Sequence, residues 1–250
     1  MLTLINTEGV VLRNRKFEEA DAILTIFTRK LGKISAVAKG AKRPKSNLLS
    51  ATQVFAYSNF SLYKSASMYK INQCDIKYNF YNLSKEISVL SYASYITQLV
   101  EVVTLENQTN NRLFDLLIKT LYLYSKGERD LEYITAIFEL KFLDYIGYKP
   151  EVSKCANCGN NNLINSKFSV IEGGAICVNC QQIITTLQKI DPTTLKLMEY
   201  ILLNDIIISS KAKVSKYLIK ELRKILKRYL GEYVDNLNLK SLNFLENLKD

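Results

Sequence analysis

The chain has 250 residues, and its 34 lysines and arginines outnumber its 24 aspartates and glutamates, which gives a formal charge of +10. It contains no histidine, so Ser-His-Asp triads, Cys-His pairs and metal sites built on histidine are excluded. The motifs G-x-x-x-x-G-K-[ST] and G-x-G-x-x-G are also missing, and nothing therefore supports a nucleotide-driven enzyme.

The positive charge favours a polyanion such as nucleic acid as partner. The alternative explanation is a lysine-rich composition without a binding role. Residues 1–15 lack the apolar run of a signal peptide, and no apolar stretch is long enough to span a membrane. We therefore expect a cytoplasmic protein without a membrane partner, in which cysteines are more often metal ligands than disulfide partners.

The N-terminal region, from Leu2 to Ile76, alternates apolar and polar residues or runs in short β-branched and aromatic stretches. The predicted strands are Thr7–Arg13, Ala22–Thr28, Lys33–Lys39, Gln53–Tyr63 and Met68–Ile76. A chain this short has few ways to hide the edges of five strands other than closing them into a barrel. The pattern predicts a small barrel of the OB type.

After Leu83 the apolar period changes from two to about 3.6, which indicates helices. The predicted N-caps are Ser84, Asn110 and Asp191. A further helix is predicted to run from Asp130, and the predicted helix ends include Gly147 and Gly231. Residues 150–185 interrupt the helices with asparagine, glycine and cysteine.

The predicted fold is therefore a multidomain α+β chain. An OB-fold β-barrel that binds nucleic acid occupies residues 1–80. A helical domain follows in two parts, residues 81–150 and 186–250, and a four-cysteine zinc ribbon is inserted between them at residues 151–185.

The strongest motif is a pair of C-x2-C sequences, formed by Cys155 with Cys158 and by Cys177 with Cys180. Each pair turns two thiolates toward one point, and two pairs complete a tetrahedral shell around Zn2+. Because four protein ligands leave no open position, the zinc is predicted to be structural. A redox CxxC pair and an iron-sulfur cluster remain alternatives, so the identity of the metal is an inference. Cys74 has no partner at such a spacing and reads as a small buried hydrophobic residue.

The excess charge is concentrated in residues 1–80, where thirteen basic and five acidic residues leave a charge of +8. Loops can carry lysine and arginine to phosphates without disturbing a barrel core. The predicted DNA contacts are Arg13, Arg15, Lys16, Arg29, Lys33, Lys39, Lys42, Arg43 and Lys45. The nearby carboxylates Glu18, Glu19 and Asp21 are expected to line the loop between the first two strands.

Aromatic residues on a barrel face can stack on bases. The candidates are Phe27, Phe55, Tyr57, Phe60, Tyr63 and Tyr69, of which alternation turns about half inward.

A second basic run lies on the last predicted helix. It comprises Lys213, Lys216, Lys220, Arg223, Lys224 and Lys227. The pattern is equally consistent with a solvated polar face, a second DNA-binding patch and a surface that binds an acidic protein segment.

These pieces, in this order, resemble the RecO family of bacterial DNA repair and recombination proteins. The specific motifs are E-G-V-V-L at 8–12, E-A-D at 19–21, F-T-x-x-x-G-K at 27–33, K-G-A-K-R-P-K-S at 39–46, and CANC and CVNC before the last helices. The resemblance covers essentially the whole chain, and it implies an OB-fold followed by a helical domain with a zinc ribbon.

The resemblance also implies a function. Such a protein binds single- and double-stranded DNA, anneals complementary strands, and works with RecR, and sometimes RecF, to load RecA onto DNA coated by single-strand-binding protein, SSB. It contacts the C-terminal tail of SSB, is not an enzyme, and is expected in the cytoplasm at the nucleoid.

Two other classes stay open. An RNA-binding or ribosome-associated protein with a barrel and a zinc ribbon would explain the same charge and motifs. An enzyme would need an acid-base set made only of Asp, Glu, Lys, Tyr or Cys.

Overall fold

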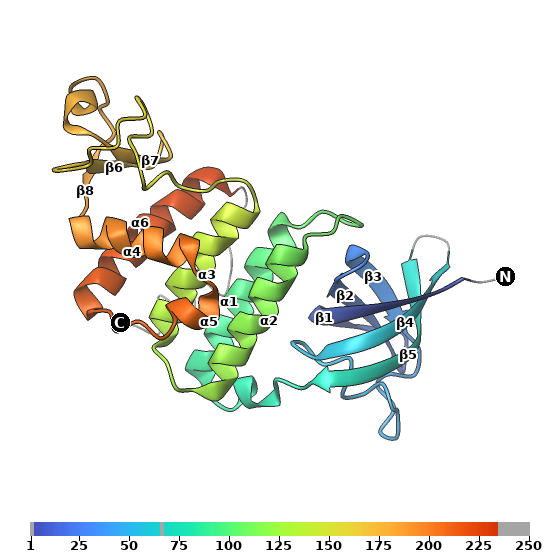
Figure 1. The fold of residues 1–250 in the computed structure, drawn as a ribbon. Helices are drawn as coiled ribbons and strands as arrows, with labels where there is room; N and C mark the ends of the chain where they lie inside the picture. The colour runs from blue at the N-terminus through green and yellow to red at the C-terminus, as the bar shows by residue number, and fades with distance from the viewer. Residues whose placement is uncertain (1–2, 66–67, 235–250) are drawn as a thin grey trace. The chain divides into compact units, whose positions relative to one another are not determined.

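A computed structural model gives the fold and describes residues 3–65 and 68–234 (Figure 1). Contacts divide the chain into two compact units, one reaching to Ser125 and the other beginning at Lys126. The first holds a β-barrel and two helices, and the second holds further helices and a small cysteine-rich sheet.

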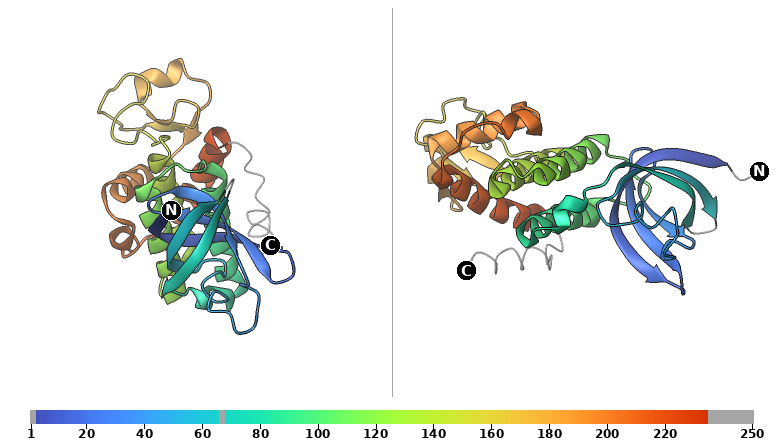
Figure 2. Two further views of the ribbon diagram at one scale, coloured as in Figure 1. Left: turned by 90° about the vertical axis from the view of Figure 1, so that its right-hand side faces the viewer. Right: turned by 90° about the horizontal axis from the view of Figure 1, so that it is seen from below.

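The barrel consists of five strands, which Figure 2 shows from two further directions. They are β1 (Leu4–Phe17), β2 (Asp21–Thr28), β3 (Gly32–Ala38), β4 (Tyr57–Ser65) and β5 (Met68–Tyr78). The strands close in the order β1-β2-β3-β5-β4. Neighbours are antiparallel except β3 and β5, which are parallel. The predicted OB-like barrel is confirmed.

Apolar and polar residues alternate along the strands, and the apolar ones form the barrel core. Leu24, Ile26 and Ile34 are fully or almost fully buried, and Phe60 and Leu62 meet them from β4. Gly9 permits this packing, because a Cβ atom there would lie 2.7 Å from the Ile26 side chain. The barrel interior is therefore closely packed around these residues.

The predicted strand at Gln53–Tyr63 is wrong at its beginning, because β4 starts only at Tyr57. The preceding residues turn back onto β1. The Phe55 N–H donates to the Val11 carbonyl at 2.9 Å, and the Val11 N–H donates to the Ala56 carbonyl at 3.0 Å. Phe55 has a positive φ of 71°, a conformation that interrupts a strand and that an apolar pattern does not reveal.

Two helices complete the first unit, α1 (Ile87–Val103) and α2 (Asn111–Lys126). The predicted cap at Asn110 is confirmed, since its side chain accepts the Leu113 N–H at 3.0 Å. The predicted cap at Ser84 is wrong, because this residue ends the short 3-10 helix η1 (Tyr81–Ser84). Buried Leu83 anchors that turn, and α1 begins three residues later.

The second unit contains α3 (Leu131–Tyr145), α4 (Pro192–Leu203), α5 (Ile206–Ser209) and α6 (Lys216–Tyr233). The predicted cap at Asp191 is confirmed, since its side chain accepts the Thr193 N–H. The predicted helix start at Asp130 is also confirmed, and the structure shows that its side chain caps α3 by accepting the Tyr133 N–H. The stop after α3 is confirmed at Gly147, whose φ is 96°. The last helix continues past Gly231 to Tyr233, since a glycine in a helix weakens it without ending it.

The cysteine-rich segment lies between α3 and α4, as predicted. It forms β6 (Lys167–Ser169), β7 (Gly174–Ile176), the 3-10 helix η2 (Val178–Gln182) and β8 (Gln188–Lys189), with the strand order β7-β6-β8. Among the residues that the structure describes, no helix is long and apolar enough to cross a membrane.

Candidate nucleic-acid interface and metal centre

The segment Lys39–Ser46 follows β3 and is fastened to the turn between β1 and β2. The Gly40 N–H donates to the Asp21 carboxylate at 2.7 Å, and the Lys42 N–H donates to the Ala20 carbonyl at 2.9 Å. Two successive turns order the segment itself, through bonds from Arg43 N–H to Gly40 O and from Ser46 N–H to Arg43 O. The segment is therefore a docked, pre-ordered structure.

This docking gathers cations from two parts of the sequence at one end of the barrel. We call this surface the cationic end, and it consists of Arg15, Lys16, Lys39, Lys42, Arg43 and Lys45. All six residues are exposed. Within the described ranges, none of their side chains has a hydrogen-bond or ion-pair partner. They are available to an external anion. The acids Glu18 and Glu19 are exposed in the β1–β2 turn and border this surface.

The structure places the other three predicted contacts, Arg13, Arg29 and Lys33, against the helices of the same unit. Arg13 forms an ion pair with Glu101 of α1 at 2.9 Å. The Lys33 ammonium donates to the Glu101 carbonyl at 2.7 Å. These side chains tie the barrel to α1, so the predicted set splits into an exposed group and an anchoring group.

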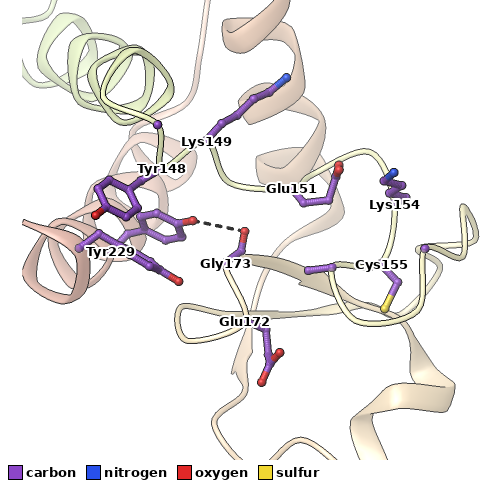
Figure 3. A pocket seen from close by; sticks show the side chains of 12 residues that line it. Tyr148, Lys149, Glu151, Lys154, Cys155, Glu172, Gly173 and Tyr229 are labelled. Carbon is purple, nitrogen blue, oxygen red and sulfur yellow. Dashed lines mark hydrogen bonds between the residues drawn. The ribbon is translucent and has the colours of Figure 1, made fainter.

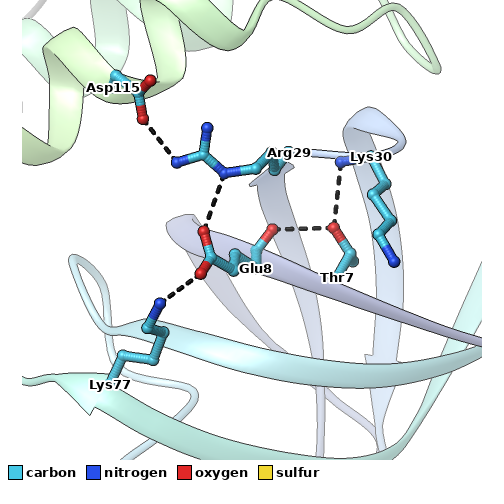
Figure 4. Close-up of polar contacts among 6 residues, drawn as sticks. All are labelled: Thr7, Glu8, Arg29, Lys30, Lys77 and Asp115. Carbon is cyan, nitrogen blue, oxygen red and sulfur yellow. Dashed lines mark hydrogen bonds and ion pairs between the residues drawn. The ribbon is translucent and has the colours of Figure 1, made fainter.

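Arg29 anchors the barrel most extensively (Figure 4). Its guanidinium donates to Glu8 of β1 at 2.9 Å and to Asp115 of α2 at 2.6 Å, and it lies 4.7 Å from the ring centre of Phe114. Lys77 of β5 also donates to Glu8. Donation from Lys77, opposed by burial and reinforced by Arg29, lowers the pKa of Glu8 to about 2. Asp115 and Glu8 in turn raise the pKa of Arg29.

The predicted stacking aromatics are largely covered. Phe27, Phe55, Phe60 and Tyr69 are buried. Tyr57 is half-buried, with the Lys77 ammonium 5.1 Å from its ring centre. Phe17 is not among the predicted stacking residues, but it is 36 % exposed at the end of β1 and follows Lys16. In the sequence, only its position next to basic residues and directly before a turn indicates that it is exposed.

The second basic run is mixed in its environment. Arg223 forms an ion pair with Glu139 of α3, which is only 2 % exposed. The lysines of the run are exposed, namely Lys213, Lys216, Lys220, Lys224 and Lys227. Glu221 on the same helix accepts hydrogen bonds from the Thr194 hydroxyl and from the Asp191 N–H, and so it holds the start of α4. On α6, basic Arg223 and acidic Glu221 therefore both have partners in other parts of the second unit.

The four predicted metal ligands converge. The sulfur atoms of Cys155, Cys158, Cys177 and Cys180 all lie within 4.8 Å of one another, and those of Cys158 and Cys177 are 3.7 Å apart. Zinc–sulfur bonds of about 2.3 Å in a tetrahedron require sulfur atoms about 3.8 Å apart. The donor set therefore fits one tetrahedral ion.

Backbone groups support the negative charge of this shell. Burial alone would raise the pKa of Cys155, but N–H groups of Cys177, Cys158 and Asn157 outweigh it and lower the pKa to about 6. The Asn160 N–H favours the thiolate of Cys158, yet the neighbouring sulfur atoms of Cys180 and Cys155 prevail and raise its pKa to about 12. Four thiolates at this separation repel one another, so a cation is needed to hold them all ionised.

Two tyrosines of α6 hold the ribbon in place. The Tyr229 hydroxyl donates to the Gly173 carbonyl at 3.3 Å, and the Tyr233 hydroxyl donates to the Val170 carbonyl at 2.8 Å. Gly173, with a φ of 72°, lies in the turn between β6 and β7. Beside this contact lies an open pocket of about 450 Å³ that reaches from Tyr148 to Cys155 (Figure 3).

Comparison with known proteins agrees with this architecture. Residues 1–80 match the family model "Recombination protein O N terminal", and residues 84–243 match "Recombination protein O C terminal". The chain is 48 % identical to the DNA repair protein RecO of Alkaliphilus metalliredigens, over 98 % of this chain and all of that protein. It is 36 % identical to the DNA repair protein RecO of Acetivibrio thermocellus, over 99 % of this chain and 98 % of that protein. The chain therefore belongs to the RecO family of bacterial DNA repair proteins.

Proposed function

We propose that the protein binds single- and double-stranded DNA through its cationic end and anneals complementary strands. In this proposal it works with RecR, and with RecF, to load RecA onto DNA coated by SSB. The observation that carries the proposal is the ordered segment Lys39–Ser46, docked on the β1–β2 turn beside exposed Arg15 and Lys16. Because the chain belongs to a DNA repair family, DNA is the anion that we expect at this surface.

The physics of annealing suits such a surface. Two DNA strands repel each other, and a protein that neutralises phosphates releases counterions and lowers that repulsion. Lysine and arginine on a loop contact phosphates without reading bases, so the bases stay free to pair. The six exposed cations supply this chemistry without nucleotide hydrolysis. We accordingly propose a mediator that has no catalytic activity.

The cysteine centre has a structural role in this proposal. A tetrahedral set of four thiolates is typical of structural Zn2+ sites, and with four protein ligands the ion has no position for a substrate. Bound there, it would cross-link the two C-x2-C turns. The buried cluster at this centre consists of the ligands Cys155, Cys177 and Cys180 and one apolar residue, Ile176, so metal binding would supply much of the ribbon's folding free energy.

The exposed lysines of the second basic run are candidates for a protein partner. An acidic segment, such as the C-terminal tail of SSB, would be attracted to Lys213, Lys216 and Lys220. We place the protein in the cytoplasm at the nucleoid, where these partners and DNA meet.

Strand annealing tests the proposal. Complementary DNA strands coated with SSB are mixed with the purified protein, with and without RecR, and duplex formation is followed by energy transfer between end labels. We expect the protein to accelerate annealing and to bind DNA in preference to RNA of the same sequence. A protein that neither binds nor anneals DNA would contradict the proposal, and preferential binding of RNA would favour the RNA-binding alternative.

A further inference from the structure

The end of β1 carries an aromatic residue within the cationic surface. Phe17 is the last residue of the strand, and 36 % of it is exposed to solvent. It lies outside the apolar cluster that fills the barrel. The exposed part of the ring is available to a ligand.

Two groups of cations lie near this ring on the backbone framework. Arg15 and Phe17 are two residues apart on β1, so they share one face and lie about 7 Å apart. Phe17 pairs with Asp21 on β2, and the Asp21 carboxylate accepts the Gly40 N–H of the cationic segment at 2.7 Å. Two strand spacings of about 4.8 Å therefore separate β1 from the segment that carries Lys39 and Lys42.

We propose that Phe17 is the base-stacking residue of this surface and that the cationic end takes single-stranded nucleic acid with one base lying on the Phe17 ring. Arg15 on one side and the Lys39–Ser46 segment on the other hold the phosphates that flank this nucleotide. The inference rests on the proposed function and adds the residue that contacts a base.

The turn residues set a limit to the path of the strand. Glu18 and Glu19 are exposed directly after Phe17, and carboxylates repel phosphates. The backbone of the bound strand is therefore directed away from the turn, over Arg15 and the cationic segment. The acids follow Phe17 in the chain, whereas the cations lie before it on β1 and across β2, so a base placed on the ring leaves its phosphates over the cations.

The experiment separates stacking from charge. Binding of two oligomers of equal length is measured by fluorescence anisotropy, one of thymidine nucleotides and one whose sugars carry no base. Stacking on an aromatic ring contributes enough that Phe17→Ala should weaken binding of the thymidine oligomer about fivefold or more. The affinity for the oligomer without bases should not change. Ile76→Ala is the matched control, because Ile76 is 40 % exposed on β5 and its neighbour on β4, Ser58, pairs with Gly9 and not with the end of β1.

A fluorescence signal gives a second, independent reading. The chain contains no tryptophan, so Phe17→Trp places a single reporter at the proposed stacking position. The thymidine oligomer should quench this tryptophan strongly and should leave the tryptophan of Ile76→Trp nearly unchanged. Phe17→Trp should also keep the affinity of the unaltered protein.

The outcomes distinguish this inference from the proposed function. If the unaltered protein binds both oligomers and Phe17→Ala binds them equally well, or loses both to the same extent, the stacking role is wrong while DNA binding stands. If the unaltered protein binds neither oligomer, the proposed function fails, and the stacking role fails with it.

Discussion

The guanidinium of Arg29, in the turn after β2, lies 2.6 Å from the carboxylate of Asp115 in α2. The same guanidinium binds Glu8 of β1, so one side chain joins two parts of the barrel to a helix. Arg29 stands in the most basic region of the chain and has the sequence context of a phosphate contact. In the folded protein its charge is already matched by two carboxylates, which indicates a structural role.

Replacing Arg29 by alanine should therefore affect stability more than DNA binding. Partly exposed ion pairs contribute little each, but Arg29 has two of them and a ring contact, and the loss should lower the free energy of unfolding by about 1–2 kcal/mol. Chemical denaturation followed by circular dichroism measures the change. The neighbouring exposed Lys30 provides a control in Lys30→Ala, which should leave stability unchanged. An Arg29→Ala protein of full stability but with weakened DNA binding would show that Arg29 contacts DNA instead.

The lowered pKa of Glu8 predicts how the stability of the first unit varies with pH. A carboxyl group whose pKa is lower in the folded state contributes stability above its unfolded pKa and loses it as the pH falls toward the folded value, here about 2. Because Glu8 is partly exposed, we expect a loss of only about 1–2 kcal/mol between pH 5 and pH 2. Glu8→Gln should remove this part of the pH dependence. Unfolding curves of the two proteins that stay parallel from pH 5 to pH 2 would contradict the assignment.

The pair of Glu139 and Arg223 predicts a stability effect in the second unit. Glu139 is 2 % exposed and Arg223 is 18 % exposed, and removing one partner of a buried ion pair is strongly destabilising. Arg223→Ala should lower the free energy of unfolding by about 3 kcal/mol or more. Lys224→Ala removes the next positive charge from an exposed position and should have little effect. Equal effects of the two substitutions would show that Arg223 acts only as a surface charge.

Loss of one metal ligand should unfold the ribbon and leave the barrel folded. Structural zinc contributes on the order of 10 kcal/mol to folding of comparable small motifs, and Cys155→Ser removes one of four ligands. Elemental analysis should show a loss of zinc, and hydrogen exchange should show loss of protection in β6 and β7 while β1 to β5 remain protected. Cys74→Ser, in the barrel, should keep the metal. Iron in the unaltered protein, or full ribbon protection in Cys155→Ser, would contradict a structural zinc site.

Local chemistry made several features predictable from the sequence. The cysteine spacing identified the ligands that the fold brings together, and the side chains of Asn110 and Asp191 cap helices because capping depends only on residues within one turn. The strand pattern predicted a closed barrel, since alternation reports which face is buried.

Other features depend on contacts between distant residues and could not be predicted. The left-handed backbone of Phe55 depends on two bonds to Val11, more than forty residues earlier. The sequence gives no sign that Arg29 and Arg223 are paired, because carboxylate partners of both lie on helices far away in the chain. The exposure of Phe17 follows from where β1 ends, which strand patterns place only approximately.

The central claim is that the cationic end binds DNA phosphates, and the salt dependence of binding tests it most directly. Each neutralised phosphate adds about 0.7 to the slope of log affinity against log salt on single strands, and about 0.9 on duplex. The triple variant Lys42→Ala, Arg43→Ala and Lys45→Ala should therefore lower the slope by about 2 on single strands, whereas the variant Lys213→Ala, Lys216→Ala and Lys220→Ala controls for an equal loss of charge. An unchanged affinity and slope in the first variant would contradict the claim.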